Sequence, residues 1–87
     1  MADKQLLEVT LLDMVSALPA GKTLGPSDVA QAIAGNAADQ WGPLMQPVRR
    51  IAVRLAKEGR LVIYRKGEAV DPDTFKGVYR LGAVRLD

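Results

Sequence analysis

The spacing of apolar residues changes once along this chain of 87 residues, at Gly59. Before Gly59, apolar residues recur every three or four positions, which is the period of an amphipathic helix. After it, segments 60–65 and 77–81 are rich in β-branched and aromatic residues, which is typical of strands. A chain of this length has room for one domain, so helices and strands must share one core. The sequence therefore predicts a single α+β domain over residues 1–87, with its core at about 4–82.

The helical part divides into three segments. The first spans about 4–18, and the second begins at Pro26 and stops at Gly35. Pro suits the first helical position, where its missing N–H would have had no partner, and Gly favours a helix end. The third segment ends near Glu58, and we expect it to begin close to Pro47, which interrupts its apolar pattern. Three helices therefore precede the strands.

The remaining part predicts an antiparallel hairpin with a long polar tip. The two strand-like segments, 60–65 and 77–81, bracket a turn-rich segment at 66–76. We expect Tyr64 and Tyr79 to face each other across the hairpin. The order of helix, short link, helix, turn, helix and hairpin is that of a winged helix-turn-helix. The predicted fold is three helices followed by a two- or three-stranded antiparallel hairpin.

The composition excludes several classes of chemistry. The sequence contains no Cys and no His, which rules out a disulfide framework, a zinc finger, a thiol nucleophile and a His-based triad. The segment Gly21-Lys22-Thr23 resembles the end of a P-loop, but Ser16 stands where the first Gly would be. We therefore predict that the protein is not an enzyme and has no cofactor, metal or small-molecule ligand.

The chain also lacks the patterns of export and membrane insertion. Glu8 and Asp13 interrupt the apolar run that a secretory signal would need. No uncharged apolar run approaches the roughly 20 residues that cross a bilayer. We expect a cytoplasmic protein with no membrane partner.

Charge is unevenly distributed along the chain. Residues 1–41 carry a net charge of −3, whereas residues 42–87 carry +5. From Arg49 to Lys66 there are seven positive residues and one negative, Glu58. A helix face selected only for solubility usually mixes both signs, since like charges repel. The pattern favours a polyanionic partner, although fluctuation in a short chain is the simpler alternative.

This charge pattern gives the candidate binding residues. With the apolar positions of the third helix turned inward, its polar side chains spread over the opposite face, and two lysines flank the hairpin tip as a wing would require. Arg and Gln side chains carry the donors that contact phosphates and purine edges in a major groove. We predict that the nucleic-acid-binding residues are Gln46, Arg49, Arg50, Arg54, Lys57, Lys66 and Lys76. The predicted partner is duplex DNA, with RNA left open, and the role is that of a transcription-associated regulator.

A protein-interaction or adaptor module is the alternative function, because a fold alone does not determine what it binds. An exposed apolar patch built from the first helix together with Val84 and Leu86 would favour this alternative, or would indicate a homodimer. Trp41 is expected to anchor the core and not to contact a ligand, since large aromatic side chains usually fill interiors.

Several short motifs together resemble a known family. They are Pro26-Ser27-x-Val29-Ala30, Trp41-x-x-Leu44-Met45-x-x-Val48-Arg49, Leu55-x-x-x-Gly59, Lys66-Gly67, Val70-Asp71-Pro72 and Gly77-x-x-Arg80-Leu81. This set, over residues 6–82, is similar to a group of small bacterial proteins of unknown function with a winged-helix-like fold. The resemblance implies a bacterial origin and supports the fold, but it implies no activity. Arg49 and Arg80 belong to the shared pattern, which leaves open a structural role for both.

Overall fold

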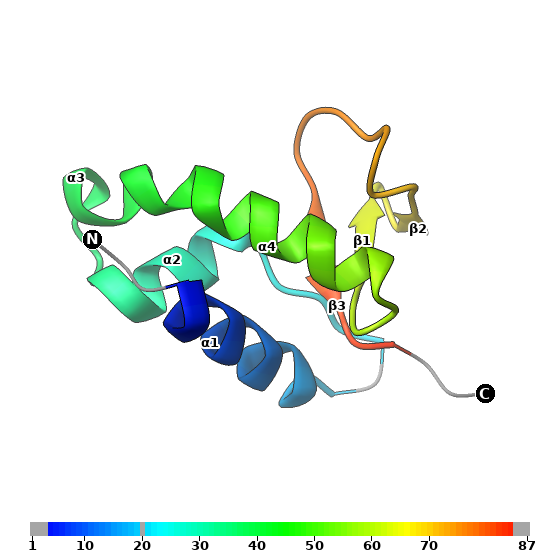
Figure 1. Ribbon diagram of the computed structural model, residues 1–87, viewed down its shortest axis with the longest axis horizontal. Coiled ribbons are helices and arrows are strands. Elements are labelled where there is room, and N and C mark those ends of the chain that lie inside the picture. The colour runs from blue at the N-terminus through cyan, green and yellow to red at the C-terminus, as the bar shows by residue number, and fades with distance from the viewer. Residues whose placement is uncertain (1–3, 20, 85–87) are drawn as a thin grey trace.

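The computed structural model describes residues 4–19 and 21–84 and has helices in its first part and a sheet in its last (Figure 1). The elements in chain order are α1 (Lys4–Ser16), α2 (Pro26–Ala34), α3 (Ala38–Trp41), the 3-10 helix η1 (Gly42–Leu44), α4 (Met45–Lys57), β1 (Val62–Arg65), β2 (Glu68–Ala69) and β3 (Arg80–Gly82). The three main helices and the three-stranded antiparallel sheet confirm the predicted α+β fold class.

The third predicted helix, α4, starts at Met45, close to Pro47 as expected, and further helical turns precede it. Helical structure begins at Ala38 and runs through α3 and η1 directly into α4, which starts at Met45. Pro47 therefore lies in the first turn of α4, where a missing N–H leaves no helical hydrogen bond unmade. Trp41, at the end of α3, is half-buried against the edge of the core, and its Nε1 donates a hydrogen bond to the Asn36 carbonyl at 3.3 Å.

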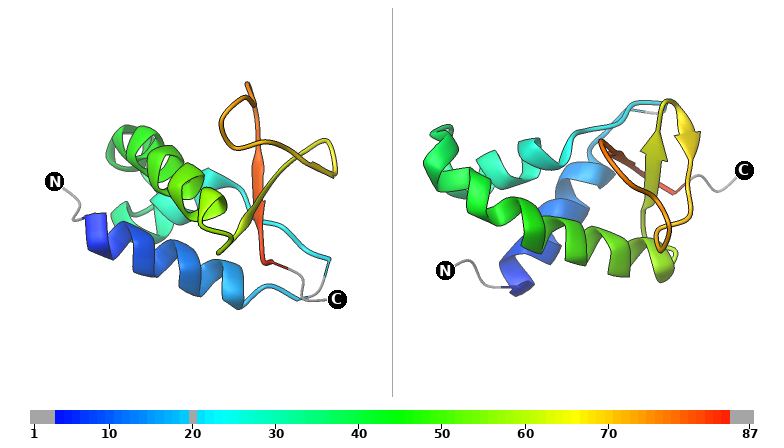
Figure 2. Two further views of the ribbon diagram at one scale, coloured as in Figure 1. Left: turned by 45° about the vertical axis from the view of Figure 1, so that its right-hand side comes forward. Right: turned by 90° about the horizontal axis from the view of Figure 1, so that it is seen from above.

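The core lies where α1, α2, α4 and the sheet meet. Each main helix contributes side chains to the core at steps of three or four residues, and β1 and β3 contribute the residues of one face of the sheet. The fully buried larger side chains are Leu7, Leu11, Val29, Val48, Leu55, Leu61, Ile63 and Leu81. Seen from above, the sheet stands at one end of the helical part, beside the C-terminal end of α4, and α3 lies at the opposite end (Figure 2). None of the described helices has the length and apolar character that a membrane-spanning helix requires.

The sheet has the strand order β2-β1-β3. A two-residue turn, Lys66-Gly67, joins β1 to β2, and φ is positive at both residues, 52° and 83°. Two positive φ values are the mark of a type I′ turn, whose twist matches that of the strands. The prediction of one long hairpin tip was therefore incomplete, because a tight turn comes first and a loop follows β2.

The register also corrects the expected tyrosine pair. Tyr64 lies opposite Arg80 on β3 and opposite Ala69 on β2, not opposite Tyr79. Tyr79 precedes β3 and is buried beside Phe75, with ring centroids 5.1 Å apart. The loop after β2 is thus anchored to the core by two aromatic rings, which the polar composition of its sequence did not indicate.

Candidate nucleic-acid interface

The candidate interface is the outward face of α4. The inward face of this helix is formed by Val48, Ile51, Ala52 and Leu55, at the three- and four-residue steps that keep side chains on one side. The opposite face carries Gln46, Arg50, Arg54 and Lys57, all exposed. In Figure 1, α1 runs along one side of α4 and the loop between β2 and β3 rises on the other. These two neighbours determine which cations of α4 remain free.

On the α1 side, Arg54 is held by a carboxylate. Its guanidinium lies 3.0 Å from the Glu8 carboxylate, and Arg60 contacts the other oxygen of the same carboxylate at 3.1 Å. The side chain of Arg54 remains 52% exposed and that of Glu8 25% exposed, and surface ion pairs contribute only about 0.2–1 kcal/mol to stability. The Glu8 carboxylate therefore adds little to stability but neutralises the charge of Arg54.

On the loop side, Lys57 is paired in the same way. Its Nζ lies 2.9 Å from the Asp73 carboxylate, and both side chains are more than half exposed. The Asp71 carboxylate accepts a hydrogen bond from the Asp73 N–H at 2.9 Å, which fixes the turn that presents Asp73. The turn predicted at this position therefore also supplies a counter-charge to α4.

Arg49 has a different environment from the other cations of α4. Its guanidinium carbon lies 4.4 Å from the centre of the Phe75 ring and 5.8 Å from that of Tyr79. The same group donates a long hydrogen bond, 3.4 Å, to the Phe75 carbonyl. A cation over an aromatic face is attracted by the ring quadrupole. Arg49 thus fastens the loop to α4, and its place on the sequence-based list of contact residues stays a prediction.

The remaining candidates on this side have no partner in the described part of the chain. Gln46 and Arg50 are exposed one helical turn apart near the start of α4, and Lys76 is exposed on the loop next to Phe75. None of these three makes a hydrogen bond or ion pair with a described residue. They are the donors most readily available to an external anion.

Lys66 belongs to a different surface. It lies in the turn between β1 and β2, on the rim of a hollow over the outer side of the sheet, together with Lys22, Tyr64 and Arg80. The neighbouring Arg65 donates from Nε to the Val78 carbonyl at 2.9 Å and so holds the loop. The structure therefore groups Lys76 with α4 and Lys66 with the sheet, a division that spacing along the sequence did not indicate.

Comparison with known proteins places the chain in a family. Residues 4–84 match the model of a family described as Protein of unknown function (DUF3253). The chain belongs to this family. No curated protein matches it. The expectation of a family of unknown function is therefore confirmed for DUF3253, and this membership brings no activity with it.

The part of the DUF3253 domain that the structure describes contains no group of three or more His, Cys, Asp or Glu side chains that could hold a metal ion. Among the buried side-chain nitrogen and oxygen atoms described there, one has no hydrogen-bond partner, the hydroxyl of Tyr79. Burial raises the pKa of Tyr79 above its ordinary value of 10.0, and the nearby Arg49 guanidinium opposes this shift. The hydroxyl is therefore neutral at physiological pH.

Proposed function

We propose that this DUF3253 domain binds duplex DNA through the outward face of α4. The observation that carries the proposal is the pair Gln46 and Arg50, which are exposed on adjacent turns and have no described partner. An Arg on the open face of a helix can contact phosphate or the edge of a guanine, and a Gln can contact an adenine. Lys76 extends this cationic surface onto the loop beside the helix.

The paired cations support the same proposal. Arg54 and Lys57 lie further towards the C-terminal end of the same face, and each is held by one carboxylate, that of the partly buried Glu8 or that of the exposed Asp73. A surface ion pair contributes little to stability, but its carboxylate repels a phosphate that approaches the cation. Binding through this face would therefore use Arg50 and Lys76 directly, and Arg54 and Lys57 would contribute once their carboxylates are removed. The role that follows is that of a transcription-associated regulator.

Removal of one free cation tests the proposal. Arg50→Ala removes an exposed guanidinium that makes no described contact, and Lys22→Ala, an exposed lysine on the sheet side, removes the same charge elsewhere. We expect Arg50→Ala to weaken duplex binding severalfold at about 50 mM salt and to reduce the slope of log affinity against log salt by about one. Lys22→Ala should leave both unchanged. The measurement is fluorescence anisotropy of a labelled random-sequence duplex.

Two results would overturn this assignment. The first is the absence of duplex binding by the unmodified domain at the lower salt concentration. The second is equal loss of affinity in Arg50→Ala and Lys22→Ala, since that would show a response to net charge and not to the α4 face. Circular dichroism of both variants verifies that the helices are intact.

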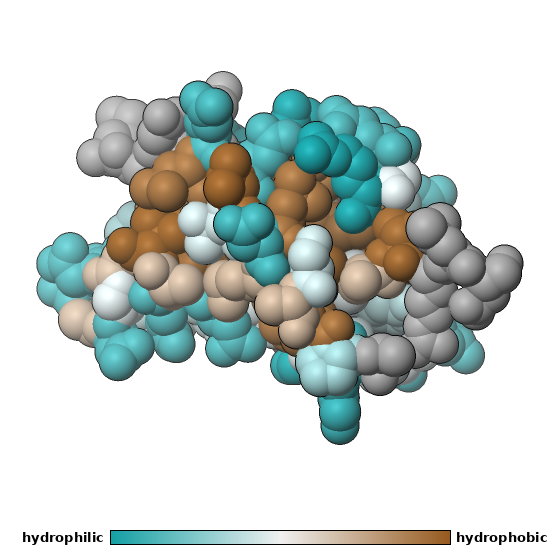
Figure 3. Space-filling model, turned by 90° about the horizontal axis from the view of Figure 1, so that it is seen from below, coloured by the Kyte–Doolittle hydropathy of each residue, from teal (hydrophilic) through white to brown (hydrophobic). Residues whose placement is uncertain are grey.

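A second candidate function, protein interaction, is favoured by α1. Leu6 and Val9 are each 49% exposed one turn apart on the side of α1 away from the core, and Val84 is 37% exposed. Apolar side chains gather over this face of the molecule (Figure 3). Leu86, which was expected to join this patch, lies outside the described residues. A patch on one helix can pack against its own copy about a two-fold axis, so the partner we propose is a second copy.

Light scattering over a range of protein concentrations tests this candidate. Self-association should give a mass near twice 9.4 kDa at high concentration, and Val9→Glu should restore the monomer mass. Ser16→Glu provides the matched control, because it places the same charge at the last residue of the helix, also exposed. A monomer at every concentration would remove the candidate.

A further inference from the structure

A hollow of about 1010 Å³ lies over the outer side of the sheet, away from α4. The link between α1 and α2 forms one wall, and β1, the Lys66-Gly67 turn and β3 form the rest. Strand residues alternate between faces, so Ile63 and Leu81 enter the core while Tyr64 and Arg80 lie on the outer face. A cavity of this size is at the upper end of those that take small ligands.

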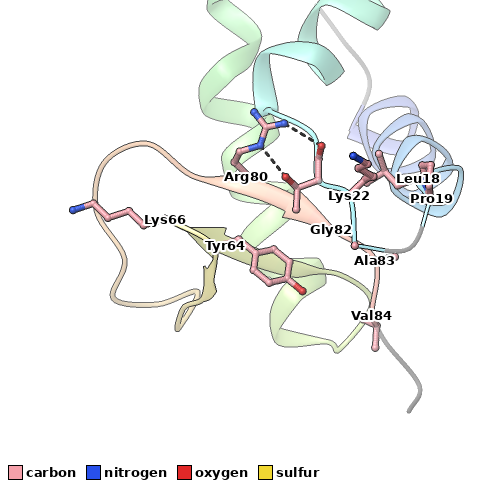
Figure 4. A pocket seen from close by; sticks show the side chains of 12 residues that line it. Leu18, Pro19, Lys22, Tyr64, Lys66, Arg80, Gly82, Ala83 and Val84 are labelled. Atoms are coloured by element: carbon pink, nitrogen blue, oxygen red, sulfur yellow. Dashed lines mark hydrogen bonds between the residues drawn. The ribbon is translucent and has the colours of Figure 1, made fainter.

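The charged residues around the hollow all have the same sign. Lys22, Lys66 and Arg80 line it, and no Asp or Glu of the described residues does so. Figure 4 shows Lys66 on one side and Lys22 on the other, with Tyr64 between them and Arg80 above. The three cations come from three separate segments of the chain, and they surround the opening without converging on one point. An extended anion with more than one charge matches this arrangement better than a single phosphate does.

Arg80 is held in place by the link. Its Nε donates to the Thr23 hydroxyl at 2.9 Å, and one terminal nitrogen donates to the Thr23 carbonyl at 3.0 Å. Leu24, the next residue, exchanges two backbone hydrogen bonds with Leu81, at 2.9 and 2.8 Å. These contacts fix the wall of the hollow relative to β3. Arg80 makes no ion pair with an acidic side chain of the described residues.

Tyr64 supplies an aromatic surface inside the hollow. It is half-buried, and its hydroxyl makes no hydrogen bond with a described residue. The ring lies close over Gly82, where an added Cβ would come within 2.8 Å of Tyr64 Cε2. Gly82 therefore leaves room for the ring beside β3. Aromatic rings on a sheet, bordered by cations, are the usual surface on which the bases of a single strand stack.

We propose that the hollow is a binding site for single-stranded nucleic acid, in which a base stacks on Tyr64 and the phosphates lie against Lys22, Lys66 and Arg80. The site is separate from α4 and does not depend on duplex binding there. The ring and the spread of the cations favour a strand over an acidic peptide, which would match the charge but not the stacking surface.

Anisotropy of a labelled thymidine oligonucleotide of about ten nucleotides tests the site, since single-strand sites span roughly 4–16 nucleotides. Tyr64→Leu should weaken binding about tenfold, whereas Tyr64→Phe, which keeps the ring, should retain it. Lys22→Ala combined with Lys66→Asn should weaken binding and reduce the salt slope by about 1.4, because each single-strand phosphate contact contributes about 0.7. Asn suits the left-handed conformation of residue 66, so the turn is preserved.

Arg50→Ala is the control for location. If the strand binds in the hollow, this change on α4 leaves oligonucleotide affinity unchanged, even where it weakens duplex binding. The proposal fails if the oligonucleotide does not bind, if Tyr64→Leu binds as well as the unmodified domain, or if only Arg50→Ala weakens binding. Competition by thymidine monophosphate as strong as that by the oligonucleotide would identify a free-nucleotide site, and competition by polyglutamate would show a site for any polyanion. Either result would overturn the proposal, and neither bears on the duplex test.

If circular dichroism shows that Tyr64→Leu does not fold, the double variant of Lys22 and Lys66 is sufficient to test the site. Both side chains are exposed and have no described partner, so their removal leaves the core intact. Unchanged oligonucleotide binding in that double variant would be enough to reject the site.

Discussion

The hydroxyl of Tyr79 is a buried polar group that the fold leaves without a partner. Such a group loses its hydrogen bonds to water on folding and gains none, at a cost of about 1–3 kcal/mol. Tyr79→Phe removes the oxygen and keeps the ring that packs on Phe75 at 5.1 Å. We expect the variant to be more stable by about 1 kcal/mol in urea unfolding at neutral pH. A loss of stability instead would mean that the hydroxyl is hydrogen-bonded in solution.

The same hydroxyl predicts how stability depends on alkaline pH. Burial raises the pKa of Tyr79 in the folded chain above the 10.0 of an unfolded tyrosine. As the pH rises through 10, the unfolded chain loses this proton before the folded one does, so unfolding becomes more favourable. The contribution of this group to the free energy of unfolding is fully present below pH 10 and is lost as the pH rises above it. Tyr79→Phe should therefore lose less stability than the unmodified domain between about pH 9 and pH 11.

Between elements, the contact of α1 with α4 determines how many cations the binding face presents. Glu8 on α1 neutralises Arg54 on α4 and also pairs with Arg60. Glu8→Gln should release Arg54, whereas Arg60 keeps a second carboxylate, that of Glu58, at 3.7 Å. We expect the variant to bind duplex severalfold more tightly at low salt and to lose less than about 2 kcal/mol of stability, since two surface ion pairs are lost. Asp13→Asn is the matched control, because it removes the same charge from the same helix at an exposed position. Equal gains in both variants would contradict a role for the Glu8–Arg54 contact.

Periodicity within each segment was sufficient to predict the three main helices and β1, because local spacing determines which face is apolar. The start of α4 was predicted to within two residues, since Pro47 is tolerated in the first turn of a helix. The Lys66-Gly67 turn was missed, because a Lys in the left-handed region is uncommon and Gly67 alone does not specify a two-residue turn. The short elements α3, η1 and β2 were not predicted either, because a segment of two to four residues is too short to show a period.

For the whole molecule, the sequence was sufficient to predict that the outward face of α4 is positively charged, but not which of its cations are paired with carboxylates. The partner carboxylates Glu8 and Asp73 lie far along the chain from the cations they neutralise, so no spacing rule brings them together. The packing of Arg49 on Phe75 could not be predicted from the sequence either, because it depends on how the loop between β2 and β3 packs against α4. The hollow over the sheet arises from the pairing of Leu24 with Leu81 across the domain. Contacts between distant segments thus determine the site.

The number of cations available across the α4 face determines the salt dependence of the complex. Arg50 and Lys76 are free, whereas Arg54 and Lys57 each hold a carboxylate that repels phosphate. Each phosphate neutralised contributes about −0.9 to the slope of log affinity against log salt, so the unmodified domain should give about −2. The double variant Glu8→Gln/Asp73→Asn removes both carboxylates and should steepen the slope to about −4.

The measurement is duplex anisotropy at a series of salt concentrations between about 50 and 200 mM. The control pair is Asp13→Asn with Glu68→Gln, which removes the same two charges from exposed positions on α1 and β2. Counterion release depends on the cations that contact phosphate and not on the net charge of the protein. If only the net charge mattered, both double variants would raise the affinity by the same factor and would have similar slopes. A steeper slope in the first variant alone requires the phosphates to lie beside Arg54 and Lys57, on the C-terminal part of the outward face of α4.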